Sequence, residues 1–426
     1  MSKSSRRLIL MSLSFALLLL ACGEEGSNDD DRQVVRIAHW WGDSRDLWEQ
    51  VIAEFEKANP KIRVEQEVMS FNVLKDKVLT QSAAGEDVGD LIPLEDWFAQ
   101  ELVQRDYFVD IKPWLERDLK DAEYFPQSIE TFRNGTTIRA FPIALGTYPL
   151  FYNRDAFDRA GERYPDSTWT YDTLVAVAIR MTHDDNGDGR PDRWGFMLDN
   201  SGGFDGLIWS MGGRILTDDL RRGAMSEPAT QRALQFWVDL VRRHHVAPEP
   251  ASLMGGTSSG GALQDFMTGR FAMAILGSHQ VGTSAPFRWD IAYPPRGPSG
   301  RKALRFAAAF GIPKSSRNAV AAWRFLTWIV REMPARYAAR MFYGHVPNSR
   351  RLAQSTEFLG SEPQIHREIL VDMIERFSFS YWRTKWFQFR DQGFLPEVDQ
   401  AVQGRKSVGE ASEEADKRIN EVLGTQ

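Results

Sequence analysis

Apolar residues recur with two different periods along the chain, and the change of period separates strands from helices. Near the start of the pattern, an apolar run at 34–38 predicts a short strand, and the spacing of apolar residues over 47–55 predicts a helix. A second strand is expected at 62–68, a second helix at 73–84 and a third strand at 90–94. Strands that alternate with helices favour a parallel sheet with right-handed crossovers, whose ligands bind beyond the carboxyl ends of the strands.

The stretch 140–153 is apolar and rich in β-forming residues, but it is interrupted by Pro142, Gly146 and Pro149. Because proline cannot donate to a strand ladder and glycine loosens the backbone, one long central strand is not expected. We interpret the stretch as extended chain that leaves one globular unit and enters another.

Strand and helix patterns resume after this stretch. Helices are predicted at 153–161, from an N-cap at Thr170 through 181, at 229–244 and at 319–331, and a final amphipathic helix runs to about residue 423. A chain of 426 residues is too long for one core. The prediction is an α/β fold of two lobes, each a mainly parallel sheet flanked by helices, with a ligand cleft at the hinge.

The lobes are assembled from separate segments in this prediction. Lobe 1 takes residues 33–143 and 280–331, and lobe 2 takes residues 146–277 and 345–426. The crossings, where the chain passes between lobes, are expected near 142–147, 276–280 and 331–345.

The first 21 residues have the features of a bacterial lipoprotein signal peptide. Three basic residues precede an apolar run at 8–21 that is too short for a permanent membrane span. The run ends in Leu-Leu-Ala and is followed by Cys-Gly, with Cys22 as the residue to be lipidated. Residues 22–32 then form an acidic tether. The sequence therefore predicts export and anchoring to a bacterial membrane, on its periplasmic or extracellular face.

Composition narrows the possible functions. Without the signal peptide the chain has 49 Lys and Arg against 58 Asp and Glu, a net charge of about −9, and it lacks a basic cluster, which argues against nucleic acid binding. Cys22 is the one cysteine of the chain, so neither an internal disulfide nor a thiolate metal site is expected.

Several segments, in their order and spacing, resemble the family-1 extracellular solute-binding proteins, the maltose-binding-protein-like receptors of carbohydrate ABC importers. They cover essentially the whole chain after the tether and are found at 55–60, 83–85, 152–161, 168–170, 184–196, 269–273, 277–278 and 321–326. The chain departs from the family pattern at 89–91, where Gly-Asp-Leu replaces Pro-Asp-Val, and at His279, where the family usually has an aromatic residue.

The resemblance implies a periplasmic-binding-protein-like fold that closes on a sugar or oligosaccharide by a hinge motion, without catalysis and without a required cofactor. It also implies ABC permease subunits as partners. We expect the protein to be a monomer.

A sugar site needs flat aromatic rings and polar groups that bond hydroxyls. Candidates follow the first and third predicted strands, accompany the crossings and lie in an aromatic-rich region near the C-terminal end: Trp40, Trp41, Asp43, Glu95, Asp96, Trp97, Tyr148, Trp209, Ser278, His279, Trp382 and Arg383. One of the two adjacent tryptophans belongs in the core, and each other aromatic could be a core residue as well. The acids could be solvated turn residues, and the histidine could be structural.

The segment 184–192 has the oxygen ligands of a calcium loop at Asp184, Asn186, Asp188 and Asp192, with the backbone carbonyl of Arg190 as a further ligand. The twelfth position is Gly195, so the usual bidentate glutamate is missing. The alternative interpretation is an Asx-rich turn without metal.

Two other functions remain open. The same receptor could bind a phosphorylated polyol or another small solute, for which Arg383 is a candidate contact. An exported glycosidase would use an acid pair such as Glu95 and Asp96. Adjacent side chains on extended chain diverge, however, and no second acid is placed roughly 5–9 Å away across a glycosidic bond.

Overall fold

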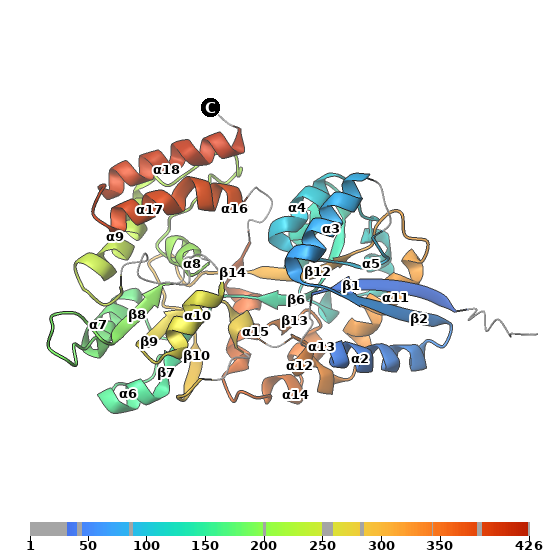
Figure 1. Cartoon of the computed structure of the whole chain (residues 1–426), viewed down its shortest axis with the longest axis horizontal. Coiled ribbons are helices and arrows are strands. Elements are labelled where there is room, and N and C mark those ends of the chain that lie inside the picture. The colour runs from blue at the N-terminus through green and yellow to red at the C-terminus, as the bar shows by residue number, and fades with distance from the viewer. Residues whose placement is uncertain are drawn as a thin grey trace, which may run out of the picture.

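The computed structural model describes residues 32–40, 45–84, 88–198, 202–248, 259–281, 285–342, 344–380 and 386–424. Two lobes lie side by side and are joined in the middle (Figure 1). The signal peptide, Cys22 and most of the acidic tether fall outside the described residues. Within those residues, no helix combines the length and the apolar character needed to cross a membrane.

The sheet of the first lobe begins with the predicted βαβαβ unit. Strand β1 (Gln33–His39) pairs in parallel with β2 (Ile62–Val68), and a parallel bridge from Ile37 to Leu91 connects it to the start of β3 (Ile92–Glu95). Helices α2 (Arg45–Ala58) and α3 (Phe71–Ala84) connect these strands. The parallel unit expected from the sequence is confirmed, and β1 and β3 end at the same edge of the sheet.

Antiparallel strands complete this sheet in the order β13-β6-β12-β3. Strand β6 (Ala140–Gly146) lies between β12 (Phe306–Gly311) and β13 (Val346–Pro347). Pro142 is accommodated inside β6 because the register with β12 shifts by one residue opposite it, between Ala308 and Ala309.

The sheet of the second lobe has the order β10-β7-β9-β8. It consists of β7 (Leu150–Asn153), β8 (Trp194–Leu198), β9 (Phe271–Ile275) and β10 (Trp289–Ala292). Only β8 and β9 among them are parallel; the other pairs are antiparallel. Both sheets are therefore mixed, and the expectation of mainly parallel sheets holds for the βαβαβ unit alone.

The first crossing, predicted near 142–147, overlaps the passage between β6, which ends at Gly146, and β7, which begins at Leu150, at residue 147. The second prediction was wrong. Residues 276–280 do not carry the chain into the first lobe. The next strand, β10, was assigned to lobe 1 from the sequence, but it pairs with β7 in the second lobe. The chain crosses instead at Arg305, between β11 (Ala303–Leu304) and β12.

The third crossing also differs from the prediction near 331–345. Residues 345–376 were assigned to lobe 2, but β13 pairs with β6, and Leu352 and Phe358 are buried in the core of the first lobe. The chain returns to the second lobe after β14 (Ser378–Phe379), which pairs in parallel with β11. A short apolar strand shows its period but not which sheet it joins, so the pattern could not assign these segments.

The remaining elements surround the two sheets. In the first lobe they are α4 (Asp96–Gln104), α5 (Lys112–Asp118), η2 (Asp121–Glu123), η3 (Pro126–Phe132), the hairpin β4 (Arg133–Asn134) and β5 (Thr137–Ile138), α11 (Ala319–Arg331), η6 (Ala335–Tyr337), α12 (Ala338–Phe342), α13 (Arg350–Ala353), α14 (Thr356–Leu359) and α15 (Arg367–Arg376). In the second they are α6 (Arg154–Ala160), α7 (Tyr171–Met181), α8 (Gly203–Ser210), α9 (Pro228–Arg242), α10 (Ser259–Met267), η5 (Ser278–Gln280), α16 (Trp386–Gln388), the π-helix η7 (Phe389–Phe394), α17 (Leu395–Val402) and α18 (Val408–Leu423).

Three hydrophobic clusters fill the molecule. One lies in each lobe, and a third contains Leu94 and Phe108 of the first lobe together with Phe151, Phe266 and Trp289 of the second. The lobes thus share buried apolar surface, whose removal from water contributes roughly 25 cal/mol per Å². The crossings are anchored in a common core.

Helix α7 packs directly on β8 at Gly195. A Cβ atom on Gly195 would lie 2.0 Å from the carbonyl oxygen of Ala178, which is backbone and cannot rotate away. We predict that Gly195→Ala lowers the free energy of unfolding by about 1–3 kcal/mol, the usual cost of overpacking, as measured by denaturant titration. Gly409→Ala in α18 is the control, because its nearest atom lies 4.0 Å away, and it should be neutral or slightly stabilising. Equal effects of the two substitutions would contradict the close approach.

Candidate functional site

A cavity of about 260 Å³ lies where the two lobes meet. Its walls come from η3 in the first lobe, from α8 and the loop after it in the second, and from two crossings. The lining residues are Glu130, Thr131, Trp209, Ile215, Leu216, Thr217, Asp218, Leu220, Arg305 and Ser380. A cavity shared by two lobes changes shape whenever the lobes move relative to each other.

The aromatic wall of the cavity is Trp209, near the end of α8. Its ring stacks on Phe379 of β14, with 4.5 Å between ring centroids and 29° between planes. The side chain is half-buried. Trp209 was among the predicted ligand contacts, and the stacked neighbour holds its ring in one orientation.

Arg305, at the second crossing, is a buried charged group of the cavity. Only 5% of it is exposed, and its guanidinium donates to the hydroxyl of Ser378 and to the carbonyl of Gln127, both at 3.0 Å. Burial lowers the pKa of Arg305 to about 10, against the opposing effect of nearby Asp96, so the group remains charged at neutral pH. Thr131 and Ser380 line the same cavity, and their hydroxyl oxygens lie 3.4 Å from each other.

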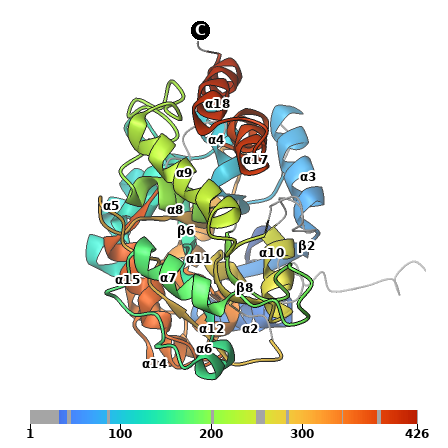
Figure 2. The ribbon, with the colours of Figure 1, turned by 90° about the vertical axis from the view of Figure 1, so that its left-hand side faces the viewer.

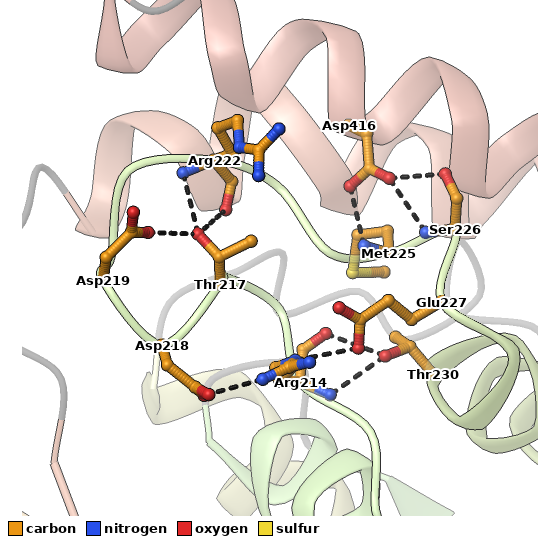
Figure 3. A network of polar contacts seen from close by, with 10 residues as sticks. All are labelled: Arg214, Thr217, Asp218, Asp219, Arg222, Met225, Ser226, Glu227, Thr230 and Asp416. Carbon is orange, nitrogen blue, oxygen red and sulfur yellow. Dashed lines mark hydrogen bonds and ion pairs between the residues drawn. The ribbon is translucent and has the colours of Figure 1, made fainter.

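The loop 214–227 forms the second-lobe wall, and internal hydrogen bonds hold it in place (Figure 3). Arg214 pairs with Glu227 and Asp218 at 2.8 and 2.7 Å. Asp416 of α18 accepts from the backbone amides of Met225 and Ser226 at 2.6 and 2.9 Å, and also from the Ser226 hydroxyl. A helix from the far end of the chain thus fixes the loop.

Thr217 organises the tip of the same loop. Its hydroxyl contacts the carboxylate of Asp219 at 2.6 Å, accepts from the amide of Arg222 at 3.2 Å and lies 3.3 Å from the carbonyl of Arg222. Leu220 takes a left-handed conformation with φ of 58°, which the surrounding bonds hold. The wall therefore keeps one shape without help from a ligand.

Three predicted residues lie at the edge of the first sheet. Trp40 follows β1, is half-buried and packs on the shared core. Glu95 ends β3, and Asp96 begins α4 with only 1% of its surface exposed. The sequence correctly places these residues at one edge, but none of them lines the cavity.

The hinge residues have structural contacts. Ser278 is fully buried, and its hydroxyl accepts from the amide of Thr147 at 3.2 Å. Tyr148, 8% exposed, packs edge-on against Phe306, with 5.6 Å between centroids. His279 packs on Phe306 and on His345, and burial lowers the pKa values of these histidines to about 3 and about 4, so both are neutral. A ligand role for the predicted members of this group stays a prediction.

The other predicted contacts cannot be placed. Trp41, Asp43, Trp382 and Arg383 lie outside the described residues, as does the side chain of Trp97.

The carboxylates of the acidic loop 184–192 accept hydrogen bonds from backbone amides of the same loop. Asp184 accepts from the amides of Gly187 and Gly189 at 2.7 and 2.8 Å, and Asp192 accepts from those of Asp185 and Asn186 at 2.8 and 3.2 Å. Among the described residues, no three His, Cys, Asp or Glu side chains are grouped so as to hold a metal ion. This geometry is that of an Asx-rich turn, and calcium binding by the loop stays a prediction.

The sequence analysis missed most of the cavity. Arg305 carries the clearest signal, because it is a single charged residue between the apolar runs 303–304 and 306–311. No sequence signal marks Glu130, Thr131 or the loop 215–220, because these residues line a cavity only where the two folded lobes meet.

Glu95 should make stability depend on pH. Burial raises its pKa from an ordinary value near 4.5 to about 8. Between these values the unfolded chain ionises while the native acid stays protonated, so stability present below about pH 4.5 is lost as pH rises through about 8. We predict that Glu95→Gln, which cannot ionise, gains thermal stability over the unmodified protein across this range and levels off above it. If melting experiments give the same difference in stability between Glu95→Gln and the unmodified protein at every pH, the burial of the Glu95 carboxyl is contradicted.

Residues 41–334 match the model of the bacterial extracellular solute-binding protein family. A mannitol-binding protein of Pseudomonas aeruginosa is 26% identical over 332 residues, covering 72% of this chain and 72% of its own. A lipoprotein of Streptomyces antibioticus is 27% identical over 315 residues, covering 69% and 66% of the two chains.

Among solved structures, the fold is similar to that of an ABC substrate-binding protein of Listeria monocytogenes in complex with cycloalternan. The TM-score is 0.76 at 23% identity, with 93% of this chain and 100% of the other covered. The likeness establishes the two-lobed periplasmic-binding-protein-like fold. The chain belongs to the bacterial extracellular solute-binding protein family.

Proposed function

We propose that this protein is the lipid-anchored receptor of an ABC importer and that it binds a sugar or oligosaccharide in the cavity between its lobes. The observation that carries the proposal is the cavity itself: Trp209, held flat by Phe379, stands beside the guanidinium of Arg305 and the hydroxyls of Thr131 and Ser380. An aromatic face suits the apolar face of a sugar ring, and the polar groups suit its hydroxyls.

Hinge closure is the mechanism that the arrangement supports. Thr131 belongs to the first lobe, Trp209 to the second, and Arg305 and Ser380 to the crossings between them. A ligand in contact with both lobes stabilises the closed arrangement by the difference between its affinities for the closed and open states. The closed form would then be presented to the permease, without chemical change of the sugar.

The relatives support the ligand class and the anchor. One relative is named for mannitol, one structural neighbour holds cycloalternan, and another relative is a lipoprotein. A phosphorylated polyol or another small solute is the alternative ligand, and Arg305 would contact its phosphate. A glycosidase has less support, because Asp96 is buried and is adjacent in sequence to Glu95.

Replacing the aromatic wall should weaken binding. We predict that Trp209→Ala lowers the affinity for the ligand at least about tenfold, or about 1.4 kcal/mol, while Trp209→Phe, which keeps a ring, loses less. The ligand is first found by thermal melting of the chain from residue 29 onward with mono-, di- and oligosaccharides and with polyol phosphates, since a ligand of the native state raises the midpoint. Affinities are then measured by calorimetry.

The matched control is Trp114→Ala. Trp114 is also half-buried but packs on Trp323 in the first lobe, 6.1 Å between centroids, so its loss should affect stability and not affinity. No midpoint shift with any sugar would reject the carbohydrate assignment, and a shift with polyol phosphates alone would establish the alternative. Release of sugar product would indicate a glycosidase. Chelator in the same melts tests the loop 184–192, because a lower midpoint would indicate bound calcium and an unchanged midpoint would indicate an Asx-rich turn.

The proposed lipid anchor is attached to Cys22. We predict that Cys22→Ser abolishes incorporation of labelled fatty acid and moves the protein from the membrane fraction to the soluble fraction. Continued membrane association of the unlabelled variant would contradict a lipid anchor at this residue.

A further inference from the structure

A second hollow, of about 430 Å³, lies in the second lobe at a distance from the cavity. It is formed by α6, the end of α7, the start of β8 and the turn before β9. Figure 1 shows α6 and α7 at the end of the lobe that points away from the first lobe, and Figure 2 looks onto that end. We call this hollow the arginine groove, after Arg159, Arg180, Arg193 and Arg270 in its lining.

Two of the arginines are held in place by acids. Arg180 forms paired hydrogen bonds with Glu162, one of them 2.9 Å long, and Arg193 donates to Asp185 at 2.7 Å. These guanidinium groups hold the pKa values of both acids below their usual range. Glu162 is the one carboxylate in the groove lining, and Asp192 acts electrostatically on Arg193 in addition to Asp185.

The other two arginines have no such compensation. Neither Arg159 nor Arg270 forms an ion pair with any acid that the structure describes, and both are exposed. Asp155 interacts electrostatically with Arg159, but its carboxylate accepts a hydrogen bond from the guanidinium of Arg288 at 2.7 Å. The groove therefore presents two arginines that lie outside any described ion pair, on a chain whose net charge is −6.

We propose that the arginine groove binds a phosphate ester. A phosphate monoester carries a charge of about −1.5 to −2 at neutral pH, which matches the two free guanidinium groups, and the planar fork of arginine suits phosphate oxygens. The carbon part of the ester would lie against the apolar lining, which includes Ala156, Met181 and Trp194. A concave hollow of this size suits a small anionic group better than the flat surface of an acidic protein.

Such an ester could be free in solution or could be the headgroup of an anionic lipid. Both place the same phosphate between the same arginines. The two sources are distinguished by offering sn-glycerol phosphate in solution and phosphatidic acid, whose phosphate is also a monoester, on vesicles, with phosphatidylcholine vesicles as the comparison without net charge.

The test uses the folded chain from residue 29 onward at constant ionic strength. We expect saturable binding of sn-glycerol phosphate in calorimetry, weakened at least about tenfold in Arg159→Ala/Arg270→Ala. Arg232→Ala is the matched control, because Arg232 is an exposed arginine on α9 of the same lobe and also lacks a described acid partner. It should bind like the unmodified protein, and so should Trp209→Ala, since the cavity is not involved.

The outcomes separate the possibilities. Loss of binding in the double variant alone supports the groove, and loss of phosphatidic acid vesicle binding in that variant identifies a lipid headgroup as the source. Equal weakening in Arg232→Ala shows unspecific attraction and overturns the proposal, as does unchanged binding in the double variant. Loss in Trp209→Ala alone would move the phosphate to the cavity. If melting shows that the double variant does not fold, Arg270→Gln replaces it under the same criteria.

Discussion

The two lobes are held together at Thr147, in the middle of the first crossing. This residue is fully buried, and its three polar groups bond to two other segments: its amide donates to the Ser278 hydroxyl at 3.2 Å, its carbonyl accepts from the Ser278 amide at 2.8 Å, and its hydroxyl donates to the carbonyl of Leu304 at 3.1 Å. A buried polar group left without a partner would cost about 1–3 kcal/mol, so each bond constrains the others. The turn at 276–280 and the second crossing are positioned by this one residue.

Apolar packing around this junction limits how the lobes can move. The ring of Phe306 lies so close to Gly146 that a Cβ atom there would approach it to 2.0 Å, and Tyr148, His279 and His345 surround the same ring. Burial keeps both imidazoles neutral, so the two histidines add no charge to the packing around Phe306. Motion between the lobes has to pivot about this closely packed centre, beside which the cavity opens.

Sequence reasoning succeeded where the controlling forces are local. Helix α11 follows the predicted residues 319–331, and α7 begins after the predicted N-cap, where Thr170 accepts from the amide of Thr173 at 3.3 Å. It failed where the answer depends on contacts between distant segments. The apolar pattern of β10 is satisfied by either sheet, and the loop 214–227 becomes a cavity wall only because Asp416, about 190 residues later, holds it.

The rigidity of that wall bears on how binding energy is used. Association with a flexible loop requires the loop to be ordered, at roughly 0.5–1.5 kcal/mol for each immobilised side chain. Here Thr217, Asp416 and the Arg214–Glu227 pair order the loop in the free protein, and Phe379 orders the ring of Trp209. A ligand that enters the cavity therefore meets a second-lobe surface already in its binding conformation. Its contacts with Thr131 and Glu130 across the cavity can then act mainly on the angle between the lobes, which is the quantity a receptor must change to report that it is loaded.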